Sequence, residues 1–462
     1  MKNEKREKIL FGNIREVLIA LSLPVILANA METIYGVVDM YWVSKLASGD
    51  TAVAAVNFVW PLIFVTMAFG IGMNIAGTSI ISQFIGLGRE KEARKVAGQL
   101  VSFSFIFSLA LGVLGVAFGR QLLAAIGAKG LILDFGWEYL SAIFLGMPTM
   151  FVFFAFQSIK QGQGDTLTPM LLAGGAVVLN IVLDPLFMFT FQLGLSGAAW
   201  ATVASRALAS LIGLYLLFFT DKGLRVKFQD LRFKAKILAT IIKVGLPAGF
   251  GQAIEGLGFL IMSIFILSYG EFSTAAFGIG NNINSLILMP AMGIGAALTT
   301  VVGQNLGANQ TERAVQAVKE SIRLSVSILT VGGIAMCLAA PAVVGIFTSQ
   351  PVVLEQGIYY LRLISLAIPL MGVFQAFVGC FQGSGHTFMA MIVTTGRLWA
   401  LRIPLVLFFK HFTSLAEKSV WYAMVISNFL ICIVGLVLFL QGSWKQRVVD
   451  EKADYLGELE TV

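Results

Sequence analysis

The chain has 462 residues, of which 57% are hydrophobic and only 12% are charged, and its formal net charge is +7. Soluble domains carry roughly 25% charged residues, so this composition excludes an ordinary water-soluble protein and indicates a polytopic membrane protein in a lipid bilayer. The positive charge does not indicate a nucleic-acid partner, because Lys and Arg lie in short segments between apolar runs, where they set membrane topology.

Twelve apolar runs along the chain reach the length of about 20 residues that a transmembrane helix needs. They predict an all-α membrane protein with twelve transmembrane helices. The expected spans are residues 14–43, 52–84, 93–118, 131–159, 168–190, 196–219, 238–268, 275–304, 314–346, 353–381, 387–409 and 419–441.

Basic residues favour every second connection between these spans, beginning with the amino terminus. The other connections hold few of them: Lys45, Arg120, Lys129, Lys410 and Lys418. By the positive-inside rule both termini are expected to be cytoplasmic, in the cell membrane of a prokaryote.

The first span contains acids although it is otherwise apolar. Glu32, Tyr35 and Asp39 fall at i, i+3 and i+7, so they share one helix face. A carboxylate in hydrocarbon is costly unless it faces a cavity, a partner or a proton, so this face should border a polar compartment. Pro24, which cannot donate a backbone hydrogen bond, predicts a kink or hinge before the acids.

A cleavable signal peptide is the alternative interpretation of this segment, with Ala28-Asn29-Ala30 as a cleavage site. Two observations oppose it. The apolar run continues well beyond Ala30, and a later copy of the segment exists in the chain.

An internal repeat organises the whole chain. AFQSIKQGQGDTLTPM (155–170) recurs as AFVGCFQGSGHTFMAM (376–391), an offset of 221 residues at which Trp200 also matches Trp421. Nearer the start of each half the offset is 223, where Pro24 and Glu32 match Pro247 and Glu255. Matches of Gln, Gly, Pro, Glu and Trp in register do not arise from chance alignment of apolar sequence.

The repeat predicts two six-helix lobes around a central cavity: residues 1–219, a cytoplasmic linker at 220–237, residues 238–441 and a cytoplasmic tail at 442–462. An offset of six helices gives both halves the same topology, related by an axis along the membrane normal, as in secondary transporters. Lobes that rock about a shared cavity predict alternating access.

The acids divide unequally between the two lobes. Asp39 lies in the first span, and Asn180 and Asp184 share a face of the fifth span at i and i+4. In the repeat, Asp39 corresponds to Met262 and Asp184 to about Ile403, so the carboxylate pair occurs in the amino-terminal lobe alone.

This pair predicts a proton site. Two carboxylates in one apolar cavity repel each other and are poorly solvated, which favours binding and release of protons near neutral pH. A purely structural role is the alternative, in which Asp39 and Asp184 tie helices together through Tyr35, Asn180 or Thr202. Na⁺ held by the same oxygens is a third interpretation, and sequence alone does not separate the two ions.

The other polar residues of the spans suggest structural roles. For Arg206 and Arg397 pairing within the bundle is favoured over contact with substrate. Cys337, Cys380 and Cys432 and the two histidines have no metal-site spacing, so no metal site and no cofactor is expected.

Several segments resemble one known family. They are QGQGDTLTPM (161–170), NIVLDPLFMFTFQLGLSGAAWATVAS (180–205), and GLP at 245–247 followed by Glu255. The chain resembles the multidrug and toxic compound extrusion (MATE) family of cation-coupled antiporters over nearly its whole length, and within it the DinF-like branch.

The resemblance implies export of small organic, often cationic, compounds in exchange for H⁺, with Na⁺ as the alternative coupling ion. It places a cation site on Asp39, Tyr35, Asn180, Asp184 and Thr202. It also makes Pro24 the bending position of the first helix.

One departure concerns the carboxy-terminal lobe. The Na⁺-coupled NorM-type branch is associated with acids on the seventh and tenth helices; Glu255 matches the first, but the second position is approximately Met371. Glu255 and Glu32 are therefore candidate contacts for substrate or a secondary cation.

Other functions fit the sequence less well. A flippase for lipid-linked precursors would need a cavity lined by Arg and Lys, whereas the residues identified here are acidic or neutral. An enzyme is not expected, because no nucleophile, base or metal constellation occurs. A passive channel would need a filter, and the twofold repeat suits rocking better. We expect a monomer.

Overall fold

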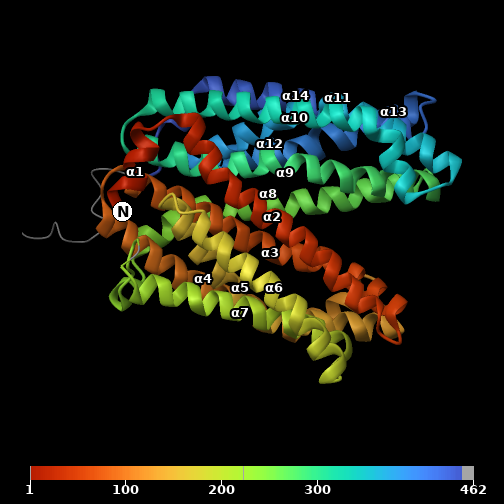
Figure 1. Cartoon of the computed structure of the whole chain (residues 1–462), viewed down its shortest axis with the longest axis horizontal. Helices are drawn as coiled ribbons and strands as arrows, with labels where there is room; N and C mark the ends of the chain where they lie inside the picture. The colour runs from red at the N-terminus through yellow and green to blue at the C-terminus, as the bar shows by residue number, and fades with distance from the viewer. Residues whose placement is uncertain (1, 222, 450–462) are drawn as a thin grey trace, which may run out of the picture.

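The computed structural model describes residues 2–221 and 223–449, and the regular structure of these residues is helical (Figure 1). The amino-terminal half contains α1 (Lys2–Phe11), α2 (Ile14–Ser44), α3 (Gly49–Gly86), α4 (Glu90–Ala125), α5 (Gly130–Gly162), α6 (Leu167–Pro185), the π-helical η1 (Leu186–Thr190) and α7 (Gly194–Phe219). The carboxy-terminal half contains the 3₁₀-helical η2 (Phe228–Leu231), α8 (Ala235–Leu267), α9 (Glu271–Gly307), α10 (Thr311–Phe347), α11 (Pro351–Gly383), α12 (Thr387–Thr395), the π-helical η3 (Gly396–Arg402), α13 (Ile403–Phe412), α14 (Lys418–Gln441) and the 3₁₀-helical η4 (Ser443–Lys445).

The twelve expected spans are confirmed. Within the described residues, 12 helical segments are long and apolar enough to cross a membrane, and each overlaps one predicted span. The largest difference is at the end of the third span, expected at residue 118 and observed at Ala125. Three features were not expected: the short helix α1, and the π-helical segments in the fifth and eleventh spans. Residue 222 of the expected linker and residues 450–462 of the expected tail lie outside the described part of the chain.

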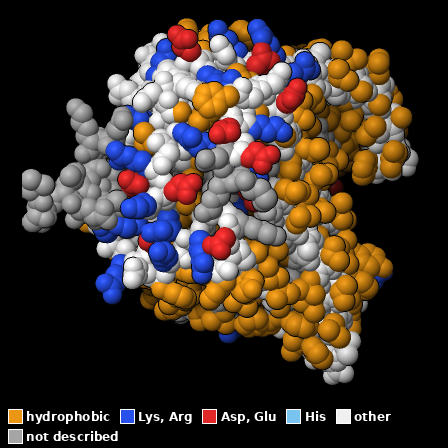
Figure 2. Space-filling view, turned by 60° about the vertical axis from the view of Figure 1, so that its left-hand side comes forward, with side chains coloured by type: hydrophobic (Ala, Val, Ile, Leu, Met, Phe, Trp, Pro, Cys, Tyr) orange, Lys and Arg blue, Asp and Glu red, His pale blue; other side chains and the backbone are white. Residues whose placement is uncertain are grey.

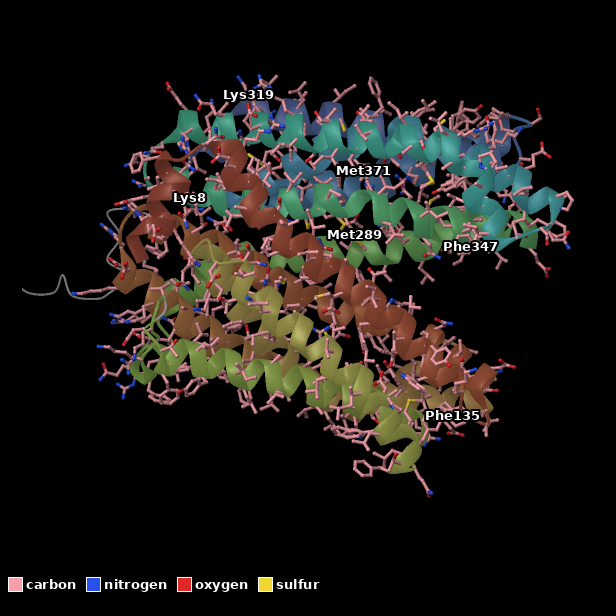
Figure 3. The ribbon with its side chains drawn as sticks, viewed as in Figure 1. Lys8, Phe135, Met289, Lys319, Phe347 and Met371 are labelled. Carbon is pink, nitrogen blue, oxygen red and sulfur yellow. The ribbon has the colours of Figure 1, made fainter. Side chains whose placement is uncertain are left out.

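The helices form two lobes that meet at one end and diverge toward the other (Figure 1). α2–α7 make the amino-terminal lobe, and α8–α14 make the carboxy-terminal lobe. In Figure 3, Phe135 and Phe347 lie at the far ends of the two diverging groups, whereas Lys8 lies where the groups meet. Across the interface α3 packs against α8 and α2 against α9, which are equivalent pairs in the repeat.

Glycine allows a close approach between α3 and α8. A Cβ at Gly72 of α3 would lie 2.5 Å from the backbone nitrogen of Gly249 and 2.6 Å from the carbonyl oxygen of Gly245, both in α8. Any larger side chain at Gly72 would therefore push these two helices apart.

Two hydrogen bonds between the lobes are related to each other by the internal repeat. Gln83 Nε2 of α3 donates to the carbonyl oxygen of Gly383 at 3.2 Å, and Gln304 Nε2 of α9 donates to that of Gly162 at 2.9 Å. At the 221-residue offset of the repeat, Gln304 is the counterpart of Gln83, and Gly383 is the counterpart of Gly162. We call this set of four residues the glutamine lock; it is buried and joins the lobes directly.

Both ends of the described chain form hydrogen bonds with the last turn of α3. Arg6 of α1 donates to the carbonyl oxygens of Ile85 and Gly86 at 2.8 Å each. Near the other end of the chain, the backbone nitrogens of Val448 and Val449 donate to Gln83 Oε1 at 3.1 and 3.3 Å. The two chain ends therefore reinforce the closed end of the molecule.

We call this end, which carries α1, Arg89–Lys95, Arg225–Lys236 and Ser443–Val449, the basic end. Figure 2 shows Lys and Arg mixed with Asp and Glu on this face, whereas hydrophobic side chains cover the flanks. The same view shows a hollow between the lobes on the side away from the basic end. The lobes are thus closed at the basic end and separated at the opposite, open end.

Candidate cation site in the amino-terminal lobe

The fifth span places Asn180 and Asp184 on one buried face. Asn180 is 1% exposed and Asp184 is fully buried, and Asn180 Nδ2 donates to Asp184 Oδ1 at 3.0 Å. Pro185 follows directly and ends the α-helical part of the span, and η1 continues it as a π-helix. π-helical turns inside helices leave backbone groups unevenly paired and are frequent at functional sites.

The first span brings Tyr35 and Asp39 to the same region. Asp39 is 6% exposed, and the hydroxyl of Tyr35 forms a 2.6 Å hydrogen bond with Thr202 Oγ1 of α7. Tyr35 is close enough to Asp39 and Asp184 to interact electrostatically with both. The structure therefore brings together the five residues named from sequence: Tyr35, Asp39, Asn180, Asp184 and Thr202.

Three oxygen atoms of this cluster have no hydrogen-bond partner among the described residues, although they are buried: Asp39 Oδ1, Asn180 Oδ1 and Asp184 Oδ2. A buried acceptor without a donor carries a desolvation cost. Binding a proton or a small cation would offset that cost, so the arrangement suits an exchangeable positive charge.

Tyr139 of α5 belongs to the same cluster and was missed by sequence reasoning. Its side chain is 3% exposed and interacts electrostatically with Asp39, Tyr35 and Asp184. One signal could have identified it, because Tyr139 has Tyr360 as its counterpart at the 221-residue offset.

Glu32, one turn before Tyr35, lies outside this cluster in a separate ion pair. Arg206 Nη2 donates to both Glu32 carboxylate oxygens, at 2.5 and 2.6 Å. The Glu32 side chain is 40% exposed and that of Arg206 is 18% exposed, so the pair lies at the edge of the lobe. The guanidinium compensates this carboxylate, as pairing within the bundle predicts.

Glu255 of α8 is paired in the same way in the other lobe. Arg397 Nη2 of η3 donates to Glu255 Oε1 at 2.6 Å, and the side chains are only 17% and 7% exposed for Glu255 and Arg397. Arg397 also stacks over the Phe374 ring at 4.6 Å and points Nη1 toward Met371 Sδ at 3.6 Å. The guanidinium of Arg397 therefore supplies a positive charge beside Met371.

The four acids that sequence placed deep in the spans therefore fall into two classes. Glu32 and Glu255 have arginine partners, whereas Asp39 and Asp184 have no basic residue within ion-pair distance among the described residues. The donor set around the two aspartates is carboxylate, amide and hydroxyl oxygen, which suits H⁺ or a hard monovalent cation. No group of three or more His, Cys, Asp and Glu that could hold a metal ion occurs in the described residues.

Comparison with known proteins identifies the family. The MatE family model matches residues 24–186 and again 247–408, so it also matches the two halves of the repeat. The probable multidrug resistance protein YoeA of Bacillus subtilis (strain 168) is 28% identical over 447 residues, covering 92% of this chain and 93% of its own.

Solved structures agree with this match. A structure described as the outward-facing conformation of a multidrug resistance MATE family transporter superposes with a TM-score of 0.88 at 27% identity, covering 94% of this chain and 97% of its own. A structure of MATE in the bent conformation gives a TM-score of 0.89 at 27% identity, with the same coverage of both chains. The chain therefore belongs to the MatE family of membrane transporters.

Proposed function

We propose that the protein is a secondary active exporter of small organic, often cationic, compounds, which exchanges them for H⁺ by alternating access. The observation that carries this proposal is the pair of buried, uncompensated carboxylates, Asp39 and Asp184, in one lobe of a two-lobe membrane protein. Intramembrane acids without a partner are typical of proton and ion pathways. The similarity to multidrug resistance proteins supports organic compounds as the cargo.

The site has five cation-binding residues: Asp39, Asp184, Tyr35, Asn180 and Thr202. Tyr139 lies beside these residues and is buried. The restriction of these acids to the amino-terminal lobe is the feature that supports placement in the DinF-like branch.

In this proposal the basic end faces the cytoplasm, in the cell membrane of a prokaryote, because Lys and Arg gather there. The hollow between the lobes then opens to the outside, in line with the similar outward-facing structure. The glutamine lock and both chain ends would close the path to the cytoplasm in this state. The protein works as a monomer.

Coupling follows from competition for the same acids. An organic cation is attracted to the cavity while Asp39 or Asp184 is charged, and a bound proton removes that attraction. Linkage requires that substrate weakens proton binding by the same factor by which the proton weakens substrate binding. Protons entering from the outside would therefore release substrate there.

Two alternatives predict different behaviour. Na⁺ held by the same oxygens would make transport depend on sodium and not on pH. A flippase for lipid-linked precursors would need free basic groups in the cavity, yet Arg206 and Arg397 are engaged by Glu32 and Glu255.

Flux into proteoliposomes containing the purified protein tests the proposal. An imposed proton gradient, acidic on the side to which substrate moves, should drive accumulation of an organic cation, and collapse of the gradient should stop it. Accumulation driven by a sodium gradient alone would show that the coupling ion is Na⁺ and not H⁺. Absence of transport under both gradients would refute the function.

A further inference from the structure

A pocket near the basic end lies on the boundary between the two lobes. Its walls are the start of α2, in the amino-terminal lobe, and the first turns of α10, in the carboxy-terminal lobe. We call it the α2–α10 pocket, and its volume is about 610 Å³. In Figure 3, Lys319 of this pocket lies on the outer edge of the carboxy-terminal lobe, toward the side on which Lys8 lies. The pocket is therefore open to the surroundings of the protein.

Four basic side chains and one acid line the pocket, and most of the positive charge is not balanced by the protein. The acid, Glu320, pairs with Arg323. Arg313 donates to backbone carbonyl oxygens at the end of α1 and just beyond it, and these carry no net charge. No carboxylate of the described residues lies within ion-pair distance of Arg15 or Lys319. The pocket therefore attracts an anion.

The internal repeat gives this pocket a counterpart between α4 and the start of α8. At the 221-residue offset, Gly98 and Ser102 of α4 correspond to Lys319 and Arg323 of α10. The two basic side chains on α10 are therefore a feature of one lobe and not of the repeat.

In the amino-terminal lobe the chain itself fills the equivalent groove. η2 lies over α4, where Ser102 Oγ donates to the carbonyl oxygen of Leu231 at 3.0 Å. A Cβ on Gly98 would lie 2.4 Å from the carbonyl oxygen of Asp230. The buried Asp230 carboxylate pairs with Arg94 Nε at 2.9 Å, so the segment that covers this groove brings a negative charge to a basic side chain. In the second groove, α1 precedes α2 as η2 precedes α8, but α1 packs against α9, and the α2–α10 pocket stays open.

Exposed apolar side chains border the pocket on the side away from the basic end. Ile19 of α2 follows Arg15 by about one helical turn, and Ile328 of α10 follows Arg323 by little more than one. Phe11, at the end of α1, is also exposed. Exposed apolar side chains of a membrane protein contact acyl chains, so the pocket lies at the level of the phospholipid headgroups.

We propose that the α2–α10 pocket binds the phosphate group of an anionic phospholipid from the leaflet at the basic end. The phosphate supplies the negative charge that the Asp230 carboxylate supplies in the other lobe, and the acyl chains lie along α2 and α10. Because the two walls belong to different lobes, the lipid joins the lobes and stabilises the state that is closed at the basic end. This effect goes beyond the proposed export function and is independent of the coupling ion and of the substrate.

The first experiment measures binding of phosphatidylglycerol with a fluorescent acyl chain to the purified protein in detergent. Each Lys or Arg near an anionic lipid contributes about fivefold in affinity, so Arg15→Gln/Lys319→Gln should bind the lipid about 25-fold more weakly. Lys227→Gln/Arg232→Gln is the matched control, because it removes two exposed cations of the basic end that lie outside the pocket. The control should bind as the wild-type protein does, and equal weakening in both double variants would overturn the proposal.

Competition identifies the source of the anion. Unlabelled phosphatidylglycerol should displace the labelled lipid, whereas phosphatidylcholine, which is zwitterionic, and glycerol phosphate, which has no acyl chains, should displace it poorly. Displacement by glycerol phosphate as readily as by the lipid would make the occupant a soluble phosphate and overturn the proposal. The chain beyond Val449 contains five acidic residues. If only a chain ended at Val449 bound the lipid, and the full chain did not, this acidic segment would be the occupant and the lipid proposal would be wrong.

The second experiment measures the effect of the lipid on the lobes. Distances between spin labels, one on each lobe at the basic end, are compared in nanodiscs of phosphatidylcholine with and without phosphatidylglycerol. Phosphatidylglycerol should increase the closed fraction in the wild-type protein and in the control, but not in Arg15→Gln/Lys319→Gln. An equal response of all three proteins, or none in the wild-type protein, would overturn the proposal. The measurement uses no substrate and no ion gradient, so its failure is distinguishable from failure of the proposed function in the flux assay.

Discussion

Asp39 and Asp184 differ from Glu32 and Glu255 because no arginine lies within ion-pair distance of their carboxylates among the described residues. In water such a difference would matter little, but in a buried site an uncompensated carboxylate must bind a proton or a cation. In the proposed mechanism the position of each arginine therefore separates the acids that exchange ions from those that do not.

The first prediction tests that distinction. Asp39→Asn and Asp184→Asn each remove a titrating charge at small steric cost, so each should reduce gradient-driven efflux below roughly a tenth of the wild-type rate. Asp134→Asn is the control, because the Asp134 side chain is 57% exposed and pairs with Arg120. Normal transport by both site variants, in folded protein, would refute the assignment.

The second prediction concerns Glu255 and Arg397, whose ion pair is largely buried. Glu255→Gln or Arg397→Gln leaves an uncompensated charge, which should destabilise the protein by about 3 kcal/mol. The double variant should recover much of that loss, and a double-mutant cycle of thermal stability in detergent measures it. Additive losses would mean that the two side chains act independently, which would favour a separate contact of Glu255 with substrate.

Among the helices, α2 connects the cation site to the lobe interface. It runs unbroken from Ile14 to Ser44, with Pro24 inside it, and packs against both α6 and α9. Pro24 has no N–H to donate to the carbonyl oxygen of Ala20, which makes this the weakest turn of a continuous helix. The hinge at Pro24 stays a prediction.

Replacement of this proline tests the hinge. Pro24→Ala restores the backbone hydrogen bond and stiffens α2, so it should slow turnover more than it weakens substrate binding. Transport rates and binding titrations on the same preparation separate the two effects. Equal loss of rate and affinity would point to packing damage instead.

For the molecule as a whole, the glutamine lock is one of the contacts between the lobes that must break when the basic end opens. Each bond of the lock is buried and contributes about 1 kcal/mol, so Gln83→Ala or Gln304→Ala should shift the balance toward the state open at the basic end by about fivefold. Inter-lobe distances between spin labels would measure this shift. Gln99→Ala is a matched control. Gln99 Oε1 accepts a hydrogen bond from the backbone nitrogen of Lys234 at 2.8 Å, and Gln99 is not part of the glutamine lock.

Equal distance distributions in Gln83→Ala, Gln304→Ala and Gln99→Ala would show that the lock does not contribute to the conformational balance.

Coupling is also a property of the whole molecule. As pH falls, the carboxylates of the amino-terminal site take up protons, so affinity for an organic cation should decrease between about pH 8 and pH 5. Asp39→Asn should flatten this dependence. Binding titrations across that range, with and without sodium, provide the test. Affinity for the organic cation that is independent of pH and falls with Na⁺ would exclude proton coupling.

Much of this protein is readable from its sequence, because the governing features are local or repeated. Apolar length predicts each span, the distribution of Lys and Arg predicts topology, and the 221-residue offset predicts two lobes. The spacing of Glu32, Tyr35 and Asp39 placed them on one face before any tertiary contact was known. Asp184 was recognised as a partner of Asp39 because each is absent from the second half.

Tertiary structure alone decided which charged groups meet. Arg206 and Glu32 are separated by 174 residues, and Arg397 and Glu255 by 142, so no local spacing relates them. Arg397 and Arg402 lie in a π-helical segment, whose period differs from the regular helical period that sequence reasoning assumes. Sequence therefore determined the spans, the lobes and the two aspartates, whereas packing between distant helices determined which of the other charged side chains are paired.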